Sequence, residues 1–431
     1  MKIKLPDQPF GYVTENSREV DSQTAFVLTA QNEKYLEDAR SRAPHSIIKA
    51  SELAPIFGLE RIKIIGITGT NGKTTTASAI YSFLLDLGYK AAMQGTRGFF
   101  MNDEIVEGKS LTTPTVLNTY RHIYQAVAAG CDYFIMEVSS HAIVQQRIEG
   151  IPFALKILTN ITQDHLDYHE TLEEYVRVKN SFFGDASPKL INKDEAKASF
   201  NIQSAMTYGV ENPATYKIMA YSLNEGISGI LQHFGEMIPF TASLHGFFNL
   251  YNLAAAIGAV HMVTQRPLEE ICDVVDHFAG VSGRMEVVSE EPLVIVDFAH
   301  TPDGMQQVLN ALKEKEVVVV FGAGGDRDRT KRPLMGKVAA HYAKKIYVTS
   351  DNPRHEDPDA IIADILKGIE GHESVTVDPN RRNAIAAAMR EREGEEVLLI
   401  LGKGDETYQQ IYDEKLPFDD REVVRELLAG I

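Results

Sequence analysis

The chain has 431 residues, of which 44% are hydrophobic and 24% charged, and its formal net charge at pH 7 is −17. This composition is that of an ordinary globular protein of roughly three domains, and the acidic charge argues against nucleic acid or an anionic membrane as its main partner. The two cysteines, Cys131 and Cys272, are too few for a disulfide framework, so we expect reduced thiols in a protein core. Residues 1–10 lack the apolar segment of a signal peptide, and no stretch approaches the roughly 18 uninterrupted apolar residues of a membrane span. We therefore expect a cytoplasmic protein without membrane insertion.

Residues 1–60 are polar and weakly patterned, and the short runs TAFVLTA and SIIKA are their clearest strand candidates. From Arg61 onward, strand-like and helix-like stretches alternate. RIKIIGITG is typical of a buried parallel strand and TTTASAIYSFLLDLG of a helix, and CDYFIMEVSS and FALKILTNIT predict further strands. Strands separated by helices indicate βαβ units and a parallel sheet.

Residues 207–245 carry shorter alternating runs with turn residues, which are more typical of antiparallel strands, and NLYNLAAAIGAVHMV then predicts a buried helix. A second alternation follows AGVSGRMEVV, with strands predicted in PLVIVDFAH, EVVVVFGAG, KKIYVTS, ESVTVDP and EVLLILGKG. We therefore predict an α/β protein with a small N-terminal domain at 1–60, a central domain at 61–281 and a C-terminal Rossmann-like domain at 282–431. The central sheet should be mostly parallel with an added antiparallel part.

The stretch GITGTNGKTTT, residues 66–76, has the context of a phosphate-binding loop, because a buried strand enters a glycine-rich turn that opens a helix. Glycines let the backbone present N–H groups to a phosphate, and the first helical turn adds its free N–H groups and positive dipole end. Lys73 can reach the β- and γ-phosphates, and the Thr74 hydroxyl can bind Mg²⁺. The usual loop has a glycine five residues before Gly72, where this chain has Ile67. A tight turn with an incidental Gly-Lys-Thr is the alternative.

Carboxylates and a histidine follow two of the predicted strands. Glu137 ends the strand in CDYFIMEVSS, where parallel sheets place ligand sites, and Asp164, His165 and Asp167 follow the next strand. Mg²⁺ prefers oxygen ligands and keeps several waters, so one carboxylate together with a nucleotide suffices. Alone, Glu137 would be explained by a hydrogen-bonded strand-end carboxylate and His165 by a loop imidazole. Their combination with the phosphate loop predicts a metal site.

A series of motifs, in order between about residues 61 and 410, resembles the Mur ligase family. They are GITGTNGKTTT, EVSSHAIVQQRI, TNITQDHLDYH, EEYVRVKNSFF, HGFFNLYNLAAAIG, GRMEVV, DFAHTPDG, GGDRDRTKRPLMG, DNPRHEDP and GKGDE. In this family the phosphate loop has the sequence GTNGKT and does not need the upstream glycine, which accounts for the unusual spacing. The resemblance implies the three-domain architecture of the family, with a P-loop ATPase-like central domain, and a role in cytoplasmic peptidoglycan precursor synthesis.

The motifs are most similar to members that add meso-2,6-diaminopimelate to UDP-N-acetylmuramoyl-L-alanyl-D-glutamate. This resemblance implies that the γ-phosphate of ATP passes to the D-glutamyl side-chain carboxylate and that the diaminopimelate amine attacks the acyl phosphate, releasing ADP and phosphate. An amine cannot usefully displace a carboxylate oxygen until that oxygen becomes a leaving group, and catalysis is then mainly positioning and charge neutralisation. The implied partners are these small molecules, with Mg²⁺ as cofactor, ATP as co-substrate, no nucleic acid and a monomeric protein.

The resemblance also assigns site residues. For ATP it implies Gly69, Thr70, Asn71, Gly72, Lys73, Thr74, Thr75, Asn249, Asn252, Arg284, Asp297 and His300. For the metal it implies Thr74, Glu137, His165 and Lys179, with Lys73, His165 and Lys179 as catalytic residues. Lys179, in YVRVKNSF, matches a lysine that the family carbamylates. An ammonium has no lone pair to offer Mg²⁺, whereas a carbamate is an anionic oxygen ligand. Without the resemblance, Lys179 would be interpreted as a solvated charge on an amphipathic helix.

Two further sets of residues match substrate positions of the family. For the nucleotide-sugar dipeptide they are Ser17, Arg18, Thr112, Thr113, Ser139, Gln145 and Arg147. For diaminopimelate they are Arg327, Asp351, Asn352, Pro353, Arg354, Gly402 and Glu406. The N-terminal match is limited to NSREV, and Arg147 alone would also be explained as a surface charge. Arg354 can bind a carboxylate through a bidentate fork, and L-lysine offers no carboxylate at its side-chain end.

Other protein classes share parts of this pattern. The same ligase could use L-lysine, and a folylpolyglutamate-synthetase-like ligase shares the fold and the ATP site but binds a pterin. A P-loop switch or motor ATPase shares the loop but gives no reason for DNPR, GKGDE or Lys179. A catalytically dead scaffold would be expected to lose Lys73 or Glu137, and both are present.

Overall fold

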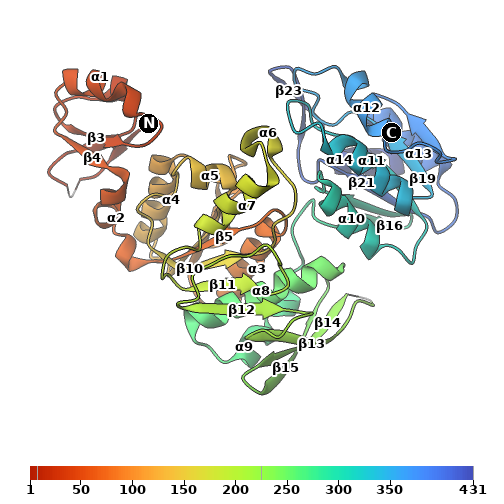
Figure 1. The fold of residues 1–431 in the computed structure, drawn as a ribbon, viewed down its shortest axis with the longest axis horizontal. Coiled ribbons are helices and arrows are strands. Elements are labelled where there is room, and N and C mark those ends of the chain that lie inside the picture. The colour runs from red at the N-terminus through yellow and green to blue at the C-terminus, as the bar shows by residue number, and fades with distance from the viewer. Residues whose placement is uncertain (7, 225, 431) are drawn as a thin grey trace.

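The computed structural model describes residues 1–6, 8–224 and 226–430, and the counts below refer to these residues. The chain forms a four-stranded, an 11-stranded and a six-stranded sheet. They lie near the N-terminus, in the middle of the molecule and towards the C-terminus, respectively (Figure 1). We call the parts of the chain built round these sheets the N-terminal, central and C-terminal regions. The predicted α/β class, with large and mostly parallel sheets plus antiparallel parts, is confirmed.

The N-terminal sheet has the strand order β1-β2-β3-β4, in which only the pairing of β1 with β2 is antiparallel. Its strands are β1 (Lys2–Lys4), β2 (Tyr12–Thr14), β3 (Thr24–Leu28) and β4 (Ser46–Lys49), and its helices are α1 (Leu36–Ser41) and α2 (Leu53–Ile56). Apolar side chains of this region share one hydrophobic core with the central region. Phe57, for example, packs with its ring centroid 5.5 Å from that of Tyr120. This shared core fixes the N-terminal region against the central sheet.

The central sheet has the order β15-β14-β13-β12-β11-β10-β5-β9-β6-β7-β8. Its strands are β5 (Lys63–Thr68), β6 (Ala91–Gly95), β7 (Gly98–Met101), β8 (Glu104–Glu107), β9 (Tyr133–Glu137), β10 (Phe153–Leu158), β11 (Lys189–Asn192), β12 (Ala205–Gly209), β13 (Tyr216–Ser222), β14 (Ile227–His233) and β15 (Glu236–Ala242). Its helices are α3 (Lys73–Asp86), α4 (Val116–Ala128), α5 (Ser140–Val144), α6 (Leu166–His169), α7 (Leu172–Ser181), α8 (Phe247–Thr264) and α9 (Leu268–Asp273). Alternate residues of β5 enter different cores: Ile65 and Ile67 pack with α3 and α8, whereas Ile64 packs with α4. The strand is therefore buried on both faces, as its sequence predicts.

The interpretation of residues 207–245 as antiparallel is partly wrong. β12 and β13 pair in parallel, and only β13 with β14 and β14 with β15 are antiparallel. The reason is the connection between β12 and β13, which wraps round the Asp194 carboxylate. That carboxylate accepts hydrogen bonds from the backbone N–H groups of Val210, Glu211 and Asn212 at 2.7, 2.9 and 2.7 Å. The chain is thereby turned so that β13 continues in the direction of β12.

The opposite edge of the central sheet was not predicted. There, β6, β7 and β8 form antiparallel pairs, and Asn102 and Asp103 join β7 to β8 with φ angles of 49° and 69°. Asn and Asp tolerate such left-handed angles, so the segment MNDE could have been used to predict this hairpin from the sequence. Arg97 lies between β6 and β7 at this edge, and Lys109 follows β8.

The C-terminal sheet has the order β16-β17-β21-β18-β19-β20, and β16 is its one antiparallel strand among the described residues. Its strands are β16 (Glu286–Glu290), β17 (Leu293–Asp297), β18 (Val317–Phe321), β19 (Lys345–Val348), β20 (Val375–Val377) and β21 (Val397–Leu401), with a separate hairpin of β22 (Tyr408–Ile411) and β23 (Glu414–Pro417). Its helices are α10 (Pro302–Ala311), α11 (Lys331–Tyr342), α12 (Pro358–Leu366), α13 (Arg381–Glu391) and α14 (Asp420–Leu428). Two hydrophobic cores, one on each face, hold the helices on the sheet.

Helix α8 is long and apolar enough to cross a membrane by length and composition alone, but 67% of it is buried inside the protein. It packs against α3 in the core of the central region. Cys131 and Cys272 are both buried free thiols, as predicted.

A buried ion pair organises the C-terminal region. The Arg381 guanidinium donates from Nε and Nη2 to the two carboxylate oxygens of Asp420, both at 2.7 Å, and neither side chain is exposed. Nη2 also donates to the backbone carbonyl of Leu401 at 2.9 Å. The pair therefore joins α13 and α14 to the carboxyl end of β21.

We expect Asp420→Ala to lower the free energy of unfolding by about 3–5 kcal/mol, because Arg381 would remain buried without its carboxylate. Equilibrium urea unfolding followed by circular dichroism measures the effect. Glu426→Ala is the control, because it removes an ion pair with Arg382 whose side chains are 44% and 42% exposed, and it should cost less than about 1 kcal/mol. An equally small loss for Asp420→Ala would contradict the structural role of the pair.

Candidate active site between the central and C-terminal regions

The phosphate loop joins β5 to α3. Gly72, at φ 84°, begins the helix, and a Cβ atom at this residue would lie 2.4 Å from Oδ1 of Asn252 on α8. Only glycine therefore fits between the loop and α8. The backbone N–H groups of Thr70 and Asn71 donate to the carbonyl and the side chain of Asn160, both at 2.9 Å. The loop is thus held by the segment that follows β10.

The Lys73 ammonium lies over this loop and donates to the carbonyls of Gly69 and Thr70, both at 2.7 Å. Burial lowers the pKa of Lys73, and the negative charges of Glu137 and Asp164 oppose that effect. A cation beside free helical N–H groups favours an anionic ligand such as a phosphate.

Glu137 lies at the end of β9 and is 2% exposed. Its carboxylate accepts hydrogen bonds from the Thr74 hydroxyl at 3.0 Å and from the backbone N–H of Thr96 at 3.0 Å. The Thr96 hydroxyl in turn lies 3.0 Å from that of Thr112. The carboxylate therefore connects the first turn of α3 with the segment that contains Thr112.

Lys179, on α7, is 1% exposed, so the solvated position that its helix pattern alone suggests is wrong. Its Nζ donates to the Gly69 carbonyl at 2.9 Å and lies 3.5 Å from the Thr68 hydroxyl. Burial, followed by the positive charge of Lys73, lowers the pKa of Lys179 well below its usual value. This shift favours the uncharged form of the amine, which is the form that can act as a nucleophile.

His165 precedes α6 in a left-handed conformation with φ 54°, and its Nε2 lies 3.4 Å from the Asp164 carboxylate. Desolvation lowers the pKa of His165, so its ring is neutral at pH 7 and has a lone pair to offer. Asp164 also lies 3.9 Å from Lys331 of α11, which brings the C-terminal region next to this loop.

The four predicted metal residues surround the phosphate loop, but only Thr74 and Glu137 contact each other. No three His, Cys, Asp or Glu side chains in the described part of the chain lie close enough together to hold a metal ion by themselves. A Mg²⁺ ion here would depend on phosphate oxygens and water, which is how proteins usually hold it beside nucleotides. The hydroxyl, the carboxylate and the neutral imidazole are ligand types compatible with that arrangement.

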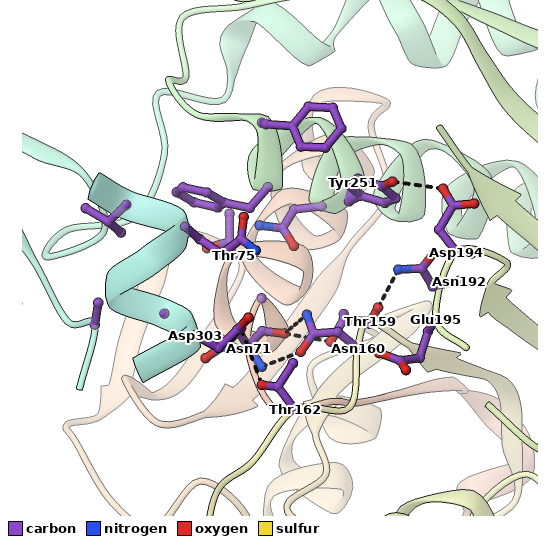
Figure 2. A pocket seen from close by; sticks show the side chains of 18 of the residues that line it. Asn71, Thr75, Thr159, Asn160, Thr162, Asn192, Asp194, Glu195, Tyr251 and Asp303 are labelled. Carbon is purple, nitrogen blue, oxygen red and sulfur yellow. Dashed lines mark hydrogen bonds between the residues drawn. The ribbon is translucent and has the colours of Figure 1, made fainter. Parts of the chain in front are cut away.

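A pocket of about 350 Å³ opens beside the phosphate loop, and Figure 2 shows polar side chains pointing into it. Residues that were predicted to bind ATP and that line it are Asn71, Gly72, Thr75, Asn252, Arg284 and Asp297. Asn249 lies behind them and accepts a hydrogen bond from Asn252 at 2.9 Å. Burial raises the pKa of Asp297, opposed by the charge of Arg284, and burial lowers the pKa of His300 to about 4.

Several lining residues were missed in the sequence. They include Thr159, Asn160, Asn192, Asp194, Tyr251 and Asp303. Asn192 ends β11 and Thr159 follows β10. Because ligands bind at the carboxyl ends of parallel strands, these two residues could have been predicted from the strand ends in the sequence. Asp303 joins the two regions, because its carboxylate accepts hydrogen bonds from Asn71 at 2.8 Å and Thr162 at 3.3 Å.

The residues predicted for the nucleotide-sugar dipeptide form two groups. Arg147 donates to the Thr113 carbonyl at 2.7 Å and to the Gln145 side chain at 2.9 Å, so it is not a free surface charge. The Thr113 hydroxyl accepts from the backbone N–H of Ser139 at 3.0 Å. Ser17 and Arg18 lie apart in the N-terminal region, and no hydrogen bond between described residues joins them to this group.

The residues predicted for diaminopimelate gather at the carboxyl ends of β19 and β21. Asn352 donates to Glu406 at 2.9 Å, and both bind the fully buried Lys403, which the sequence analysis missed, at 3.1 and 3.0 Å. Gly402, at φ 112°, is needed because a Cβ atom there would lie 2.5 Å from the Asp351 carboxylate. Pro353 follows Asn352 in the same turn.

Arg354 adopts a left-handed conformation with φ 52°, which costs a non-glycine residue roughly 1–2 kcal/mol. Backbone hydrogen bonds to Gln410 at 3.1 Å and from Tyr412 at 2.7 Å hold it there. Desolvation, followed by the charge of Arg327, lowers the pKa of Arg354. The guanidinium groups of Arg327 and Arg354 donate to the backbone carbonyls of Asp326 and Gly325, and neither forms an ion pair with a carboxylate of residues 1–6, 8–224 or 226–430. Two neighbouring guanidiniums without anionic partners are suited to binding a carboxylate.

The loop after β10 contacts C-terminal residues that follow Arg327 in the chain. Gln163 Nε2 lies 3.4 Å from the Asp328 carboxylate and 3.4 Å from the Thr330 hydroxyl. Burial lowers the pKa of His141 on α5; the charge of Asp167 opposes this effect, and the charges of Arg147 and Arg327 add to it.

Comparisons with known proteins agree with this geometry. Residues 67–260 match the Mur ligase middle domain, and residues 283–404 match the Mur ligase, glutamate ligase domain. A UDP-N-acetylmuramoyl-L-alanyl-D-glutamate–2,6-diaminopimelate ligase from Wolinella succinogenes is 54% identical over 431 residues, covering 100% of this chain and 99% of its own. A solved structure of a ligase with the same name is 30% identical, with a TM-score of 0.68 and coverage of 100% and 99%. A Mycobacterium tuberculosis folylpolyglutamate synthase complexed with ADP and AMPPCP is similar in fold alone, at 18% identity, a TM-score of 0.67 and coverage of 82% and 91%.

Lys73→Ala is expected to weaken ATP binding and to abolish ATP-dependent turnover while the fold stays intact. A charge-assisted hydrogen bond contributes about 1.5–3 kcal/mol, so affinity should fall roughly 10–100-fold. Isothermal titration calorimetry with ATP and Mg²⁺ measures the affinity, circular dichroism checks the fold, and Lys90→Ala, at an exposed lysine after α3, is the control. Near-normal affinity and turnover would show that the loop has been assigned wrongly.

Proposed function

This chain belongs to the Mur ligase family, and we propose that it joins meso-2,6-diaminopimelate to the D-glutamyl carboxylate of UDP-N-acetylmuramoyl-L-alanyl-D-glutamate, with ATP as co-substrate. ADP and phosphate are the other products. The full-length similarity to the Wolinella succinogenes ligase supports this substrate set. The observation that carries the choice of amine is the pair Arg327 and Arg354 beside the Asn352–Glu406–Lys403 network, because neither arginine is paired with a carboxylate of the described residues.

The proposed reaction divides the substrates between two regions. The phosphate loop and Lys73 hold the triphosphate, and Arg284, Asp297 and His300 close the ATP site from the C-terminal side. Thr74 and Glu137, together with phosphate oxygens, would hold Mg²⁺, which would supply positive charge to neutralise the transferring phosphoryl group. The proposal keeps the predicted domains, 1–60, 61–281 and 282–431, because each large sheet lies within one of them.

The chemistry follows from this division. A D-glutamyl carboxylate oxygen attacks the γ-phosphorus, the bond to ADP breaks, and the acyl phosphate forms on the central side near Thr113 and Arg147. The unprotonated amine of diaminopimelate then attacks the acyl carbon, and phosphate leaves with the former carboxylate oxygen. This chain contributes orientation and electrostatic stabilisation, which are the main sources of catalysis in phosphoryl transfer.

Lys179 is proposed to react with CO₂ through its neutral amine, forming an N–C bond and releasing one proton. The resulting carbamate is an anion beside the phosphate loop and supplies the oxygen ligand that an ammonium cannot. The burial of the Lys179 amine and its depressed pKa support this modification.

The carbamate predicts one additional carbonyl signal in the ¹³C NMR spectrum of protein equilibrated with ¹³CO₂. The signal should be absent in Lys179→Ala, whose turnover should fall roughly 10–100-fold or more because a metal-site partner is lost. Lys189→Ala is the control, because Lys189 is equally buried but lies at β11. If the signal persisted in Lys179→Ala, the carbamate would be at another residue.

The proposed role places the protein in the cytoplasm, where ATP and nucleotide-sugar precursors are available. The proposed site is built within one chain, so a monomer suffices. The product is a peptidoglycan precursor, through which the enzyme contributes to cell-wall synthesis, cell shape and division. L-Lysine as amine substrate and a folate-type acceptor are the alternatives. Arg354 argues against L-lysine, because it has no carboxylate partner among the described residues.

Arg354→Ala should lower kcat/KM for diaminopimelate at least tenfold, because a charge-assisted carboxylate bond of about 1.5–3 kcal/mol is lost. ATP affinity should stay near normal, and L-lysine should be a poor substrate of the parent because Arg354 would face its ammonium. The measurement is kcat/KM for both amines at saturating ATP and nucleotide dipeptide. Arg329→Ala removes a guanidinium that is 67% exposed and bound to Glu356, and it is the matched control. A parent that prefers L-lysine would contradict the specificity while leaving the ligase reaction standing.

A further inference from the structure

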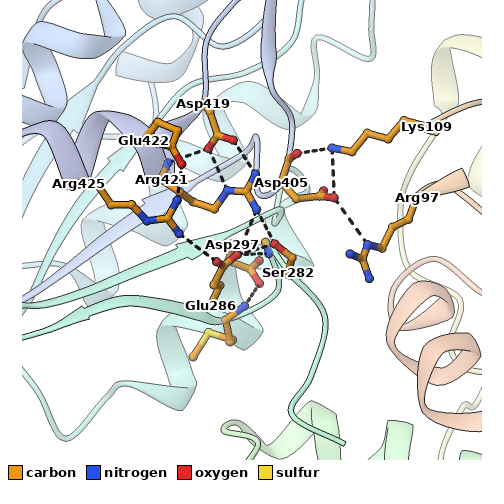
Figure 3. Close-up of polar contacts among 12 residues, drawn as sticks. Arg97, Lys109, Ser282, Glu286, Asp297, Asp405, Asp419, Arg421, Glu422 and Arg425 are labelled. Atoms are coloured by element: carbon orange, nitrogen blue, oxygen red, sulfur yellow. Dashed lines mark hydrogen bonds and ion pairs between the residues drawn. The ribbon is translucent and has the colours of Figure 1, made fainter. Parts of the chain in front are cut away.

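A small ionic cluster joins the unpredicted edge of the central sheet to the C-terminal region (Figure 3). The Asp405 carboxylate lies 3.2 Å from Lys109 Nζ and 3.7 Å from Arg97 Nε, and Lys109 also donates to the Asp405 carbonyl. The side chains are partly buried, with exposed fractions of 18% for Asp405, 34% for Lys109 and 29% for Arg97. Neither cation forms another ion pair with the residues that the structure describes. One carboxylate is thus shared by two cations of the other region.

Asp405 is firmly fixed on the C-terminal side. Gly283, at φ 70°, allows the close approach of the Asp405 backbone, because a Cβ atom at Gly283 would lie 2.1 Å from the Asp405 nitrogen. Gly404 also packs closely on Phe298, because a Cβ atom at Gly404 would lie 2.8 Å from the Cβ atom of Phe298. The loop that carries Asp405 therefore cannot move far without moving the rest of the C-terminal region.

Each member of the cluster lies within three residues, along the chain, of a residue of the proposed site or of one that contacts it. Asp405 immediately precedes Glu406, which binds Asn352 and Lys403 in the amine site. Arg97 immediately follows Thr96, whose hydroxyl contacts Thr112. Lys109 lies three residues before Thr112 on the same segment. The ion pairs therefore connect the segment of the dipeptide site directly to the loop of the amine site.

This connection differs in place from the other polar contacts between the two regions. Those contacts come from the phosphate loop and the segment after β10, through Asn71, Thr162 and Asp164. The Arg97 and Lys109 contacts come from the β6–β7 turn and from the segment after β8, beyond β9 in the sheet.

We propose that Asp405 is a positioning residue that, through Arg97 and Lys109, sets the C-terminal region at the orientation in which the bound amine meets the acyl phosphate. The inference rests on the proposed ligase reaction and adds a residue to it. Asp405 contacts no substrate in this role. Amine attack is sensitive to small displacements, since a 1 Å misplacement can cost a hundredfold in rate. Formation of the acyl phosphate involves the C-terminal region only at the ATP site, where the contacts of Asp303 with Asn71 and Thr162 hold the two regions independently of Asp405, so it should be affected less.

A mutant cycle tests this role with Asp405→Asn, the double variant Arg97→Gln/Lys109→Gln, and the triple variant. Asp405→Asn and the double variant should each lower kcat/KM for diaminopimelate roughly 5–30-fold, and the triple variant should be no worse than either, because all three break the same contact. Acyl-phosphate formation, followed by positional isotope exchange in ¹⁸O-labelled ATP without the amine, should change less than twofold. Glu426→Gln, which alters an exposed ion pair within the C-terminal region, is the control and should change neither rate.

Small-angle X-ray scattering of the same proteins, with ATP analogue and Mg²⁺ present, gives a readout that does not depend on the substrates. The radius of gyration should rise in Asp405→Asn and in the double variant, but not in Glu426→Gln. Unchanged amine transfer in Asp405→Asn, additive losses in the triple variant, or an equal loss of isotope exchange would overturn the positioning role. If the parent used no diaminopimelate at all, the proposed function would fail, and the scattering alone would decide whether the contact holds the regions together.

Discussion

The hydrogen bond from Asn71 to Asp303 joins the phosphate loop to the first turn of α10, and the rest of the site is arranged round this contact. The loop belongs to the central region and the carboxylate to the C-terminal region, so the position of one sheet relative to the other is set where ATP is proposed to bind. The same boundary between the central and C-terminal regions, which we call the seam, contains two further contacts, between Lys331 and Asp164 and between Thr162 and Asp303. A reaction that needs one substrate on each side of a seam depends on this geometry more than on any single catalytic group.

Buried lysines are the second feature of the site. Lys73 and Lys179 both donate to the Gly69 carbonyl, and the pKa of each is lowered by burial. Burying two neighbouring lysines costs folding free energy, and groups with perturbed pKa values cluster at functional sites. We propose that Lys73 binds a phosphate and that Lys179 is converted to a carbamate anion.

The sequence predicted the parts of the fold whose signal is local. The strand of the phosphate loop, the helix that follows it and the buried strands of the C-terminal sheet have apolar patterns that leave few alternatives, and the structure has them where they were expected. The β12–β13 pairing could not be predicted, because its direction is set by Asp194, which lies outside the segment. Lys403 and Asp303 were missed for a related reason. Both lie within quoted motifs, GKGDE and DFAHTPDG, but their importance comes from contacts with residues far away in the chain, which the motifs themselves do not reveal.

Amide formation between diaminopimelate and the nucleotide dipeptide at the expense of ATP can be tested by phosphate release from the purified protein with each substrate omitted in turn, together with the mass of the product. We expect release only when ATP, UDP-N-acetylmuramoyl-L-alanyl-D-glutamate and diaminopimelate are all present. The product should be heavier than the dipeptide by one diaminopimelate less one water. Steady ATP hydrolysis without the dipeptide and the amine, or a product that contains L-lysine in preference to diaminopimelate, would contradict the proposed reaction.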